Sequence, residues 1–259
     1  MLLNISNIQH FSVGDGDGIR TTVFFKGCNL CCPWCHNPEN LTATPAIMHY
    51  KALNKTEVSG KKVTVGEVLL EVLEDADFYE QSGGGVTLSG GEVMLQAEGA
   101  AKLVEELNKK DISTLIDTAG CVPYKAFEKL NPLVQGYLFD FKTADERKYE
   151  EIGGDLKTVT KNLIRLISDG ADVKLRIPLI PDFNTDEASI FNICRHLNKL
   201  GITEMELLPF HRLGSAKYEA LGLEYAYKNY EPFTKEELEK ITKQYSKYFK
   251  VKLKGRKIL

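Results

Sequence analysis

A strand pattern followed by a helical pattern recurs six times along the chain, with about thirty residues between repeats. Strands are expected at 20–26, 85–89, 113–117, 136–141, 172–180 and 204–210. Helices are expected after them, from 65, around 100–107, from 123, at 155–168, at 186–200 and around 235–249. Strands that alternate with helices form a parallel sheet. The sequence therefore predicts an α/β fold, either a barrel or a doubly wound sheet.

The length and the loop pattern favour one domain. A chain of 259 residues is ordinary for a single α/β barrel, and no low-complexity tract divides it. We therefore expect a single domain over 1–259. Residues 40–62 are polar and show no periodicity, so we expect a loop between the first strand and its helix.

Charge and hydropathy exclude several classes of partner. Lys and Arg number 33 against 36 Asp and Glu, and a net charge of −3 favours neither nucleic acid nor an anionic membrane. The N-terminus lacks the pattern of a signal peptide, and no stretch reaches the roughly 18 apolar residues of a membrane span. We expect a cytoplasmic protein, where clustered cysteines indicate a metal or catalytic site and not a disulfide framework.

Unusual polar residues follow each predicted strand. The loops at the carboxyl ends of parallel strands gather on one face and carry the chemistry. In chain order these positions hold a cysteine cluster, Gly90, Gly91 and Glu92, then Asp117, then Asp140 and Lys142, then Arg176 within a strand, and finally His211. Each has an ordinary explanation when taken alone, such as a helix cap or a turn. Their shared position predicts that they meet at one site.

The cysteine cluster places Cys28, Cys31, Cys32 and Cys35 within eight residues. Side chains of neighbours in an extended segment point apart, so Cys31 and Cys32 are not both expected to bind one compact cluster. A structural zinc site takes four ligands, normally from two separated pairs, and the sequence offers no second pair. Three thiolates suit a [4Fe–4S] cluster with one open iron. Zinc and simple buried cysteines remain alternatives.

Six motifs, in chain order, resemble those of the glycyl-radical-enzyme activating enzymes of the radical S-adenosylmethionine (SAM) superfamily. They are DGDGIRTTVFFKGC, CHNPE, GGGVTLSGGE, IDTAG, FDFK and ELLPFHRLG. The cysteine spacing, with an aromatic residue before the third ligand, is typical of that superfamily. The resemblance covers nearly the whole chain and implies a partial (β/α)6 TIM-like barrel. Because eight units close a full barrel, we expect this one to be laterally open.

The resemblance also implies roles for the site residues. The cluster ligands are Cys28, Cys32 and Cys35. The residues implied around SAM are Trp34 near the adenine, Gly90, Gly91 and Glu92 at the amino group, and Lys142, Arg176 and His211 around SAM and the reacting methylene. Those implied to hold a monovalent cation, Na⁺ or K⁺, beside the SAM carboxylate are Asp117, Thr118 and Asp140.

The chemistry that the resemblance implies begins with reduction of one [4Fe–4S] cluster by flavodoxin or ferredoxin. SAM is then cleaved to methionine and a 5′-deoxyadenosyl radical, which takes hydrogen from a glycine Cα of a partner glycyl-radical enzyme. We expect a monomer that works under anaerobic conditions. The rival expectations are a radical SAM enzyme that acts on a small molecule or another peptide, and a zinc-stabilised binding module.

Two residues depart from the family pattern, which has proline in place of Asp17 and asparagine in place of Ala119. These departures put the local shape of two loops in doubt. Longer family members insert a ferredoxin-like domain with further cysteines after the first motif. Residues 40–85 contain no cysteine, so we expect neither that domain nor a further cluster.

Overall fold

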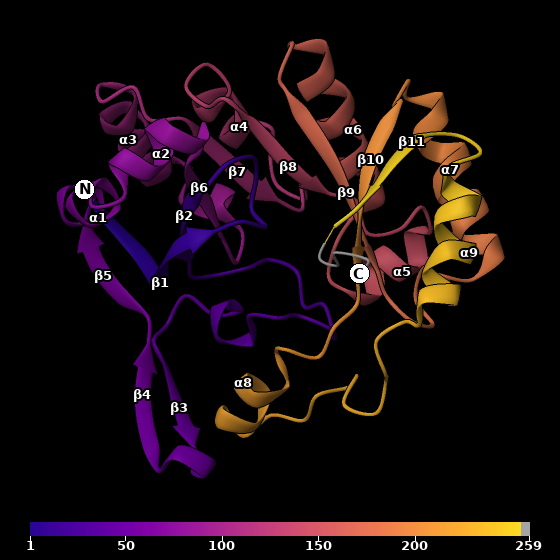
Figure 1. Ribbon diagram of the computed structural model, residues 1–259, viewed down its shortest axis with the longest axis horizontal. Helices are drawn as coiled ribbons and strands as arrows, with labels where there is room; N and C mark the ends of the chain where they lie inside the picture. The colour runs from indigo at the N-terminus through magenta and orange to yellow at the C-terminus, as the bar shows by residue number, and fades with distance from the viewer. Residues whose placement is uncertain (255–259) are drawn as a thin grey trace.

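A single nine-stranded sheet forms the centre of the computed structural model, which describes residues 1–254 (Figure 1). In order across the sheet the strands are β11 (Lys250–Leu253), β10 (Glu204–Pro209), β9 (Val173–Leu179), β8 (Gly136–Asp140), β7 (Thr114–Thr118), β6 (Gly85–Gly90), β2 (Arg20–Phe25), β1 (Leu2–Ser12) and β5 (Lys61–Thr64). Strand β1 is antiparallel to both β2 and β5, whereas β2 and β6 to β11 run parallel. Within residues 1–254 the edge strands β5 and β11 do not pair, so the expected open α/β sheet is confirmed.

Helices follow six of the seven parallel strands in the predicted order, and most of them cover the outer side of the curved sheet, whereas the short helix at 215–220 lies away from it (Figure 1). They are α1 (Val65–Leu73), α2 (Ala76–Ser82), α3 (Ala97–Asn108), α4 (Lys125–Leu130), α5 (Glu146–Glu151), α6 (Leu156–Ser168), α7 (Glu187–Lys199), α8 (Ser215–Ala220) and α9 (Lys235–Tyr245). Their apolar faces are buried as the periodicity predicts; in α3, for example, Ala100, Leu103 and Leu107 are fully covered. None of these helices is long and apolar enough to cross a membrane.

The loop predicted at 40–62 is wrong in part, because a hairpin of β3 (Ala46–Tyr50) and β4 (Lys55–Ser59) forms there. A short 3₁₀ turn, η2 (Lys51–Leu53), joins the two strands, and Asn54 completes it in the left-handed conformation. Of the ten residues in these strands only Met48 is buried, so no alternation of apolar and polar residues marks them. Strands β1, β5 and β11 also lie outside the six predicted units, and β5 takes up the last two residues of the predicted loop.

Candidate active site

The cysteine loop leaves the carboxyl end of β2 and turns back over the sheet. Cys31 is exposed, and its N–H donates to the carbonyl of Ile152 at 2.9 Å. Cys28, Cys32 and Cys35 are partly covered, and the Cys35 N–H donates to the Cys32 carbonyl at 3.0 Å. Burial raises the pKa of Cys32 to about 12 and that of Cys35 to about 11. Without a metal these thiols are therefore protonated at neutral pH.

The donor set fits an iron–sulfur cluster better than a single ion. Across residues 1–254, no three His, Cys, Asp or Glu side chains converge closely enough to ligate one metal ion. A [4Fe–4S] cluster binds each cysteine at a different iron, so its thiolates need not converge on a point. The charges of Cys28, Cys31 and Cys35 all raise the pKa of Cys32, so the four thiols lie near one another, and of the four only Cys31 is exposed. The residues present therefore fit such a cluster.

A stretch of backbone without side chains lies beside the cysteine loop, at the end of β6. Gly90 has φ +110°, and a Cβ there would lie 2.5 Å from the backbone of Phe25. A Cβ on Gly91 would lie 2.1 Å from the carbonyl oxygen of Gly27. Both positions therefore require glycine. The Glu92 N–H donates to the same Gly27 carbonyl at 2.8 Å, which fixes this turn against the start of the cysteine loop.

Glu92 is fully buried in this turn and bound by three donors. Its Oε1 accepts from Thr118 Oγ1 at 2.8 Å and from the Met94 N–H at 3.2 Å, and its Oε2 accepts from the Ala119 N–H at 3.0 Å. Burial nevertheless outweighs these bonds and raises the pKa of Glu92 to about 7. The departure at Ala119 does not disturb this contact, because the backbone N–H makes it.

The next two strand ends are joined by Arg176 of β9. Its Nη2 lies 2.5 Å from Asp117 Oδ1, and its Nε lies 2.8 Å from Asp140 Oδ1. Ser89 Oγ donates to the other Asp117 oxygen at 2.7 Å. All three charged side chains are shielded from solvent, and a buried arrangement of this kind is stable only when the charges are paired. Arg176 thus supplies a positive charge between the two acids.

Lys142 connects this group to the cysteines. Its Nζ lies 3.5 Å from Asp140 Oδ2, and its backbone N–H donates to the Tyr149 hydroxyl at 3.1 Å. Burial is the largest single influence and opposes its charge, but Asp140 together with Cys32 and other acidic groups outweighs burial and raises the pKa of Lys142. The same ammonium lowers the pKa of Cys28, Cys32 and Cys35 against the larger effect of burial. Lys142 therefore favours the thiolate forms that bind iron.

The sixth strand brings His211 onto the cysteine loop. The rings of His211 and His36 stack with their centroids 3.9 Å apart, and His36 Nε2 lies 3.1 Å from the His211 carbonyl oxygen. Burial first, and His211 second, lower the pKa of His36 to about 4. The polar residues at the ends of β6 to β9 and after β10 thus lie around the cysteine loop, as their positions in the sequence predicted.

Trp34 of the cysteine loop is buried in an aromatic group. Its ring centroid lies 4.4 Å from that of Phe183 and 6.1 Å from that of Tyr227. Tyr227 makes tilted ring contacts in turn with Tyr225 and Tyr230, from the segment after α8. This segment therefore covers the cysteine loop from one side.

Several residues of the site carried no role in the sequence analysis. Ser89 lies in β6, and Asp15 lies in the loop between β1 and β2. Asp15 accepts a hydrogen bond from Thr22 at 2.8 Å, and its negative charge contributes to raising the pKa of Asp117. Both residues belong to the six family motifs, so these motifs could have indicated that they are part of the site. The Lys217 ammonium of α8 contacts Glu39 Oε1 at 2.6 Å, and no local pattern indicates this pair. Asp17 forms an ion pair with Lys174 of β9.

Solved structures share this architecture. A radical SAM methyltransferase from Sphaerobacter thermophilus matches with a TM-score of 0.64 and 14% identity, over 91% of this chain and 66% of that one. A domain of a pyruvate-formate lyase-activating enzyme from Bacteroides vulgatus matches with a TM-score of 0.55 and 22% identity, over 66% of this chain and 99% of that one. Residues 14–136 match the family described as a 4Fe-4S single cluster domain. The fold is therefore that of the radical SAM proteins.

Proteins related in sequence identify the family within the radical SAM proteins. The pyruvate formate-lyase 2-activating enzyme of Escherichia coli is 37% identical, over 84% of this chain and 80% of that protein. The trans-4-hydroxy-L-proline dehydratase activating enzyme of Clostridioides difficile is 31% identical, over 97% of this chain and 99% of that protein. The chain belongs to the family of glycyl-radical-enzyme activating enzymes. It is a radical SAM oxidoreductase that activates a partner enzyme, as the motifs predicted.

Proposed function

We propose that this chain binds one [4Fe–4S] cluster through Cys28, Cys32 and Cys35, and that Cys31 is not a ligand. When bound, the reduced cluster and SAM together supply the 5′-deoxyadenosyl radical that abstracts hydrogen from a glycine of the partner. The half-buried positions of the three thiols and the cation of Lys142 beside them support this assignment. Loading of the cluster must release thiol protons, because burial keeps these pKa values high.

The turn at Gly90, Gly91 and Glu92 is proposed to receive the amino group of SAM. The two glycines allow the ligand to approach the backbone closely. Glu92 then offers a buried carboxylate to the amino group, and a charge-assisted hydrogen bond there is stronger than one between neutral groups. Trp34 is proposed to lie near the adenine, since it belongs to the same loop as the cluster ligands.

The charged group of Asp117, Arg176, Asp140 and Lys142 is proposed to hold the SAM carboxylate. Arg176 and Lys142 are the cations available to it, and a guanidinium can bind a carboxylate through two donors. A monovalent cation, Na⁺ or K⁺, at Asp117, Thr118 and Asp140 is also proposed. Arg176 already pairs with both acids, and Thr118 donates to Glu92, so this ion would require both contacts to loosen. His211 is proposed to lie near the reacting methylene.

The partner is proposed to be a glycyl-radical enzyme that presents a glycine-containing loop, and the electron donor a flavodoxin or ferredoxin. The open edge of the sheet, between β5 and β11, is the observation that supports a protein substrate. We also propose that residues 1–259 form one domain and act as a monomer in the cytoplasm.

Electron paramagnetic resonance tests this function. The reconstituted protein is mixed, without oxygen, with SAM, a strong reductant and a candidate glycyl-radical enzyme from the same organism. A stable glycyl radical should appear in the partner, and deuterated glycine in the partner should give deuterated 5′-deoxyadenosine. Deuterium transferred to 5′-deoxyadenosine from a labelled free metabolite, with no radical in the partner, would instead favour a radical SAM enzyme that acts on a small molecule.

A further inference from the structure

The hairpin of β3 and β4 has one covered face and one bare face. Met48 is buried on the inner face, where α8 packs against β3. On the outer face Ile47 pairs across the hairpin with Val58, and their exposed fractions are 58% and 67%. Leu53 in the connecting turn is 72% exposed. We call Ile47, Leu53 and Val58 the hairpin face. Neighbouring exposed apolar side chains of this kind mark sites of interaction.

Positive charge surrounds the hairpin face. Lys51 lies in the connecting turn, and Lys61 and Lys62 lie in β5, directly after the hairpin. None of these three lysines forms an ion pair with the part of the chain that the structure describes. Lys55 pairs with Glu57, the one acid of the hairpin. The segment is thus basic in a chain whose net charge is −3, which favours an acidic partner surface.

The hairpin extends one border of the open side of the sheet. β5 and β11 are the two edges of the sheet, and β4 continues into β5 through Gly60. Figure 1 shows the hairpin projecting from the end of β5, away from the sheet. A protein that inserts a loop between the two edges must leave the rest of its surface outside. The hairpin is placed to contact that surface.

We propose that the hairpin face, with Lys51, Lys61 and Lys62, docks an acidic surface of the glycyl-radical partner that carries exposed apolar side chains. This inference rests on the proposed function. The apolar face contributes affinity, while the lysines accelerate encounter and set the orientation of the partner. The hairpin therefore determines which partner is activated without taking part in SAM cleavage.

Two variants test the two parts of this surface. One is Ile47→Ser with Val58→Ser, and the other is Lys51→Glu, Lys61→Glu and Lys62→Glu. All five residues are exposed, so the fold should persist, and thermal unfolding checks this. The matched apolar control is Ile164→Ser with Phe191→Ser on α6 and α7, where the exposed fractions are 47% and 52%.

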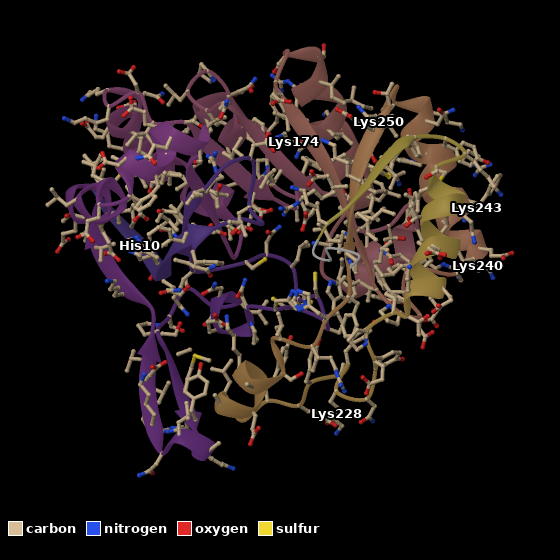
Figure 2. All side chains as sticks on the ribbon, viewed as in Figure 1. His10, Lys174, Lys228, Lys240, Lys243 and Lys250 are labelled. Atoms are coloured by element: carbon tan, nitrogen blue, oxygen red, sulfur yellow. The ribbon has the colours of Figure 1, made fainter. Side chains whose placement is uncertain are left out.

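The charge control is Lys240→Glu with Lys243→Glu. Both lysines lie on α9, across the molecule from the hairpin (Figure 2). Each reconstituted protein is assayed for SAM cleavage with dithionite in the absence of partner. Each is then assayed for radical yield against the concentration of the glycyl-radical enzyme that the wild type activates.

SAM cleavage without partner should match the wild type in all variants. The partner concentration for half-maximal radical yield should rise at least about tenfold in both hairpin variants and stay unchanged in the controls. For the lysine variant the difference should shrink as salt is raised. Hairpin variants that behave like the controls, while the wild type installs the radical, would overturn the docking inference alone.

Two other outcomes would also overturn it. Variants that slow reduction by flavodoxin but install the radical normally with dithionite would make the hairpin a reductant site. Failure of the wild type to install any radical in the partner would instead overturn the proposed function, and the docking inference with it.

Discussion

Arg176 Nε lies 2.8 Å from Asp140 Oδ1, so the guanidinium of the fifth parallel strand is held by the carboxylate at the end of the fourth. The same guanidinium contacts Asp117, at the end of the third. Burial favours protonation of Asp140, but Arg176 and Lys142 overcome it and hold the pKa of Asp140 below its ordinary value. The ends of two strands are thereby connected to the middle of a third through one buried side chain.

Replacing Arg176 by Gln should destabilise the metal-free protein by about 3–5 kcal/mol at pH 7, because two buried carboxylates lose their partner. Urea unfolding measures this free energy. Arg165→Gln is the control, since Arg165 pairs with Glu128 on the exposed surface and such pairs contribute about 1 kcal/mol or less. Adding Asp140→Asn to the Arg176 variant should recover part of the loss. Equal losses in the two arginine variants would contradict the buried pairing.

Glu92 should make the metal-free protein less stable as the pH rises. Its pKa is about 7 in the fold against an ordinary value of 4.5, so the folded state retains the proton between these values. Its stabilising effect is full below pH 4.5 and is lost as the pH rises to about 7, a change on the order of 3 kcal/mol.

The Glu92→Gln variant should lack this change, because glutamine does not titrate. The measurement is the free energy of unfolding in urea at several pH values from 4.5 to 8. Glu80→Gln, on the exposed side of α2, should keep the slope of the wild type. A Glu92 variant with that same slope would show that Glu92 titrates normally in the fold.

The sequence predicted most of what depends on local periodicity. The six βα units, the cysteine loop after β2 and the polar residues after the strands could be read from it, since parallel strands place their carboxyl ends together. The sequence did not indicate which of these residues form hydrogen bonds or ion pairs with one another. Asp117 and Asp140 suggested a bound cation, whereas Arg176 lies between them in the structure. Whether two acids pair with a cationic side chain or with a bound ion depends on side-chain packing.

Contacts between residues far apart in the sequence could not be predicted either. Lys217 meets Glu39 across 178 positions, and neither residue lies in a periodic segment that points to the other. The β3–β4 hairpin escaped notice for a different reason. A two-stranded sheet with a single buried residue, Met48, does not produce the alternation that identifies a strand.

The four cysteines of the loop should differ in their effect on iron content. Cys31→Ser should retain about four irons per chain after anaerobic reconstitution, because Cys31 is exposed and the other three thiols suffice for one cluster. Ser in place of Cys28, Cys32 or Cys35 should lower the iron content and abolish SAM cleavage. Iron analysis and Mössbauer spectroscopy provide the measurement. Loss of the cluster in the Cys31 variant alone would reverse the assignment.

The proposed cation site can be separated from the charge that Arg176 supplies. If an ion bridges the SAM carboxylate and the two acids, potassium should tighten SAM binding to the reconstituted wild type. In Asp140→Asn, SAM binding should weaken by about tenfold and lose its response to potassium, because one carboxylate ligand of the ion is gone.

Isothermal titration of SAM, with and without potassium, measures both effects. Asp77→Asn, an exposed substitution on α2, controls for the change in net charge. SAM affinity in Asp140→Asn equal to that of the wild type would make Asp140 a structural partner of Arg176 only. The wild type could also show no response of SAM affinity to potassium while Asp140→Asn still binds SAM more weakly. That result would mean that Arg176 and Lys142 neutralise the SAM carboxylate without a bound ion, since these two cations already lie against Asp140.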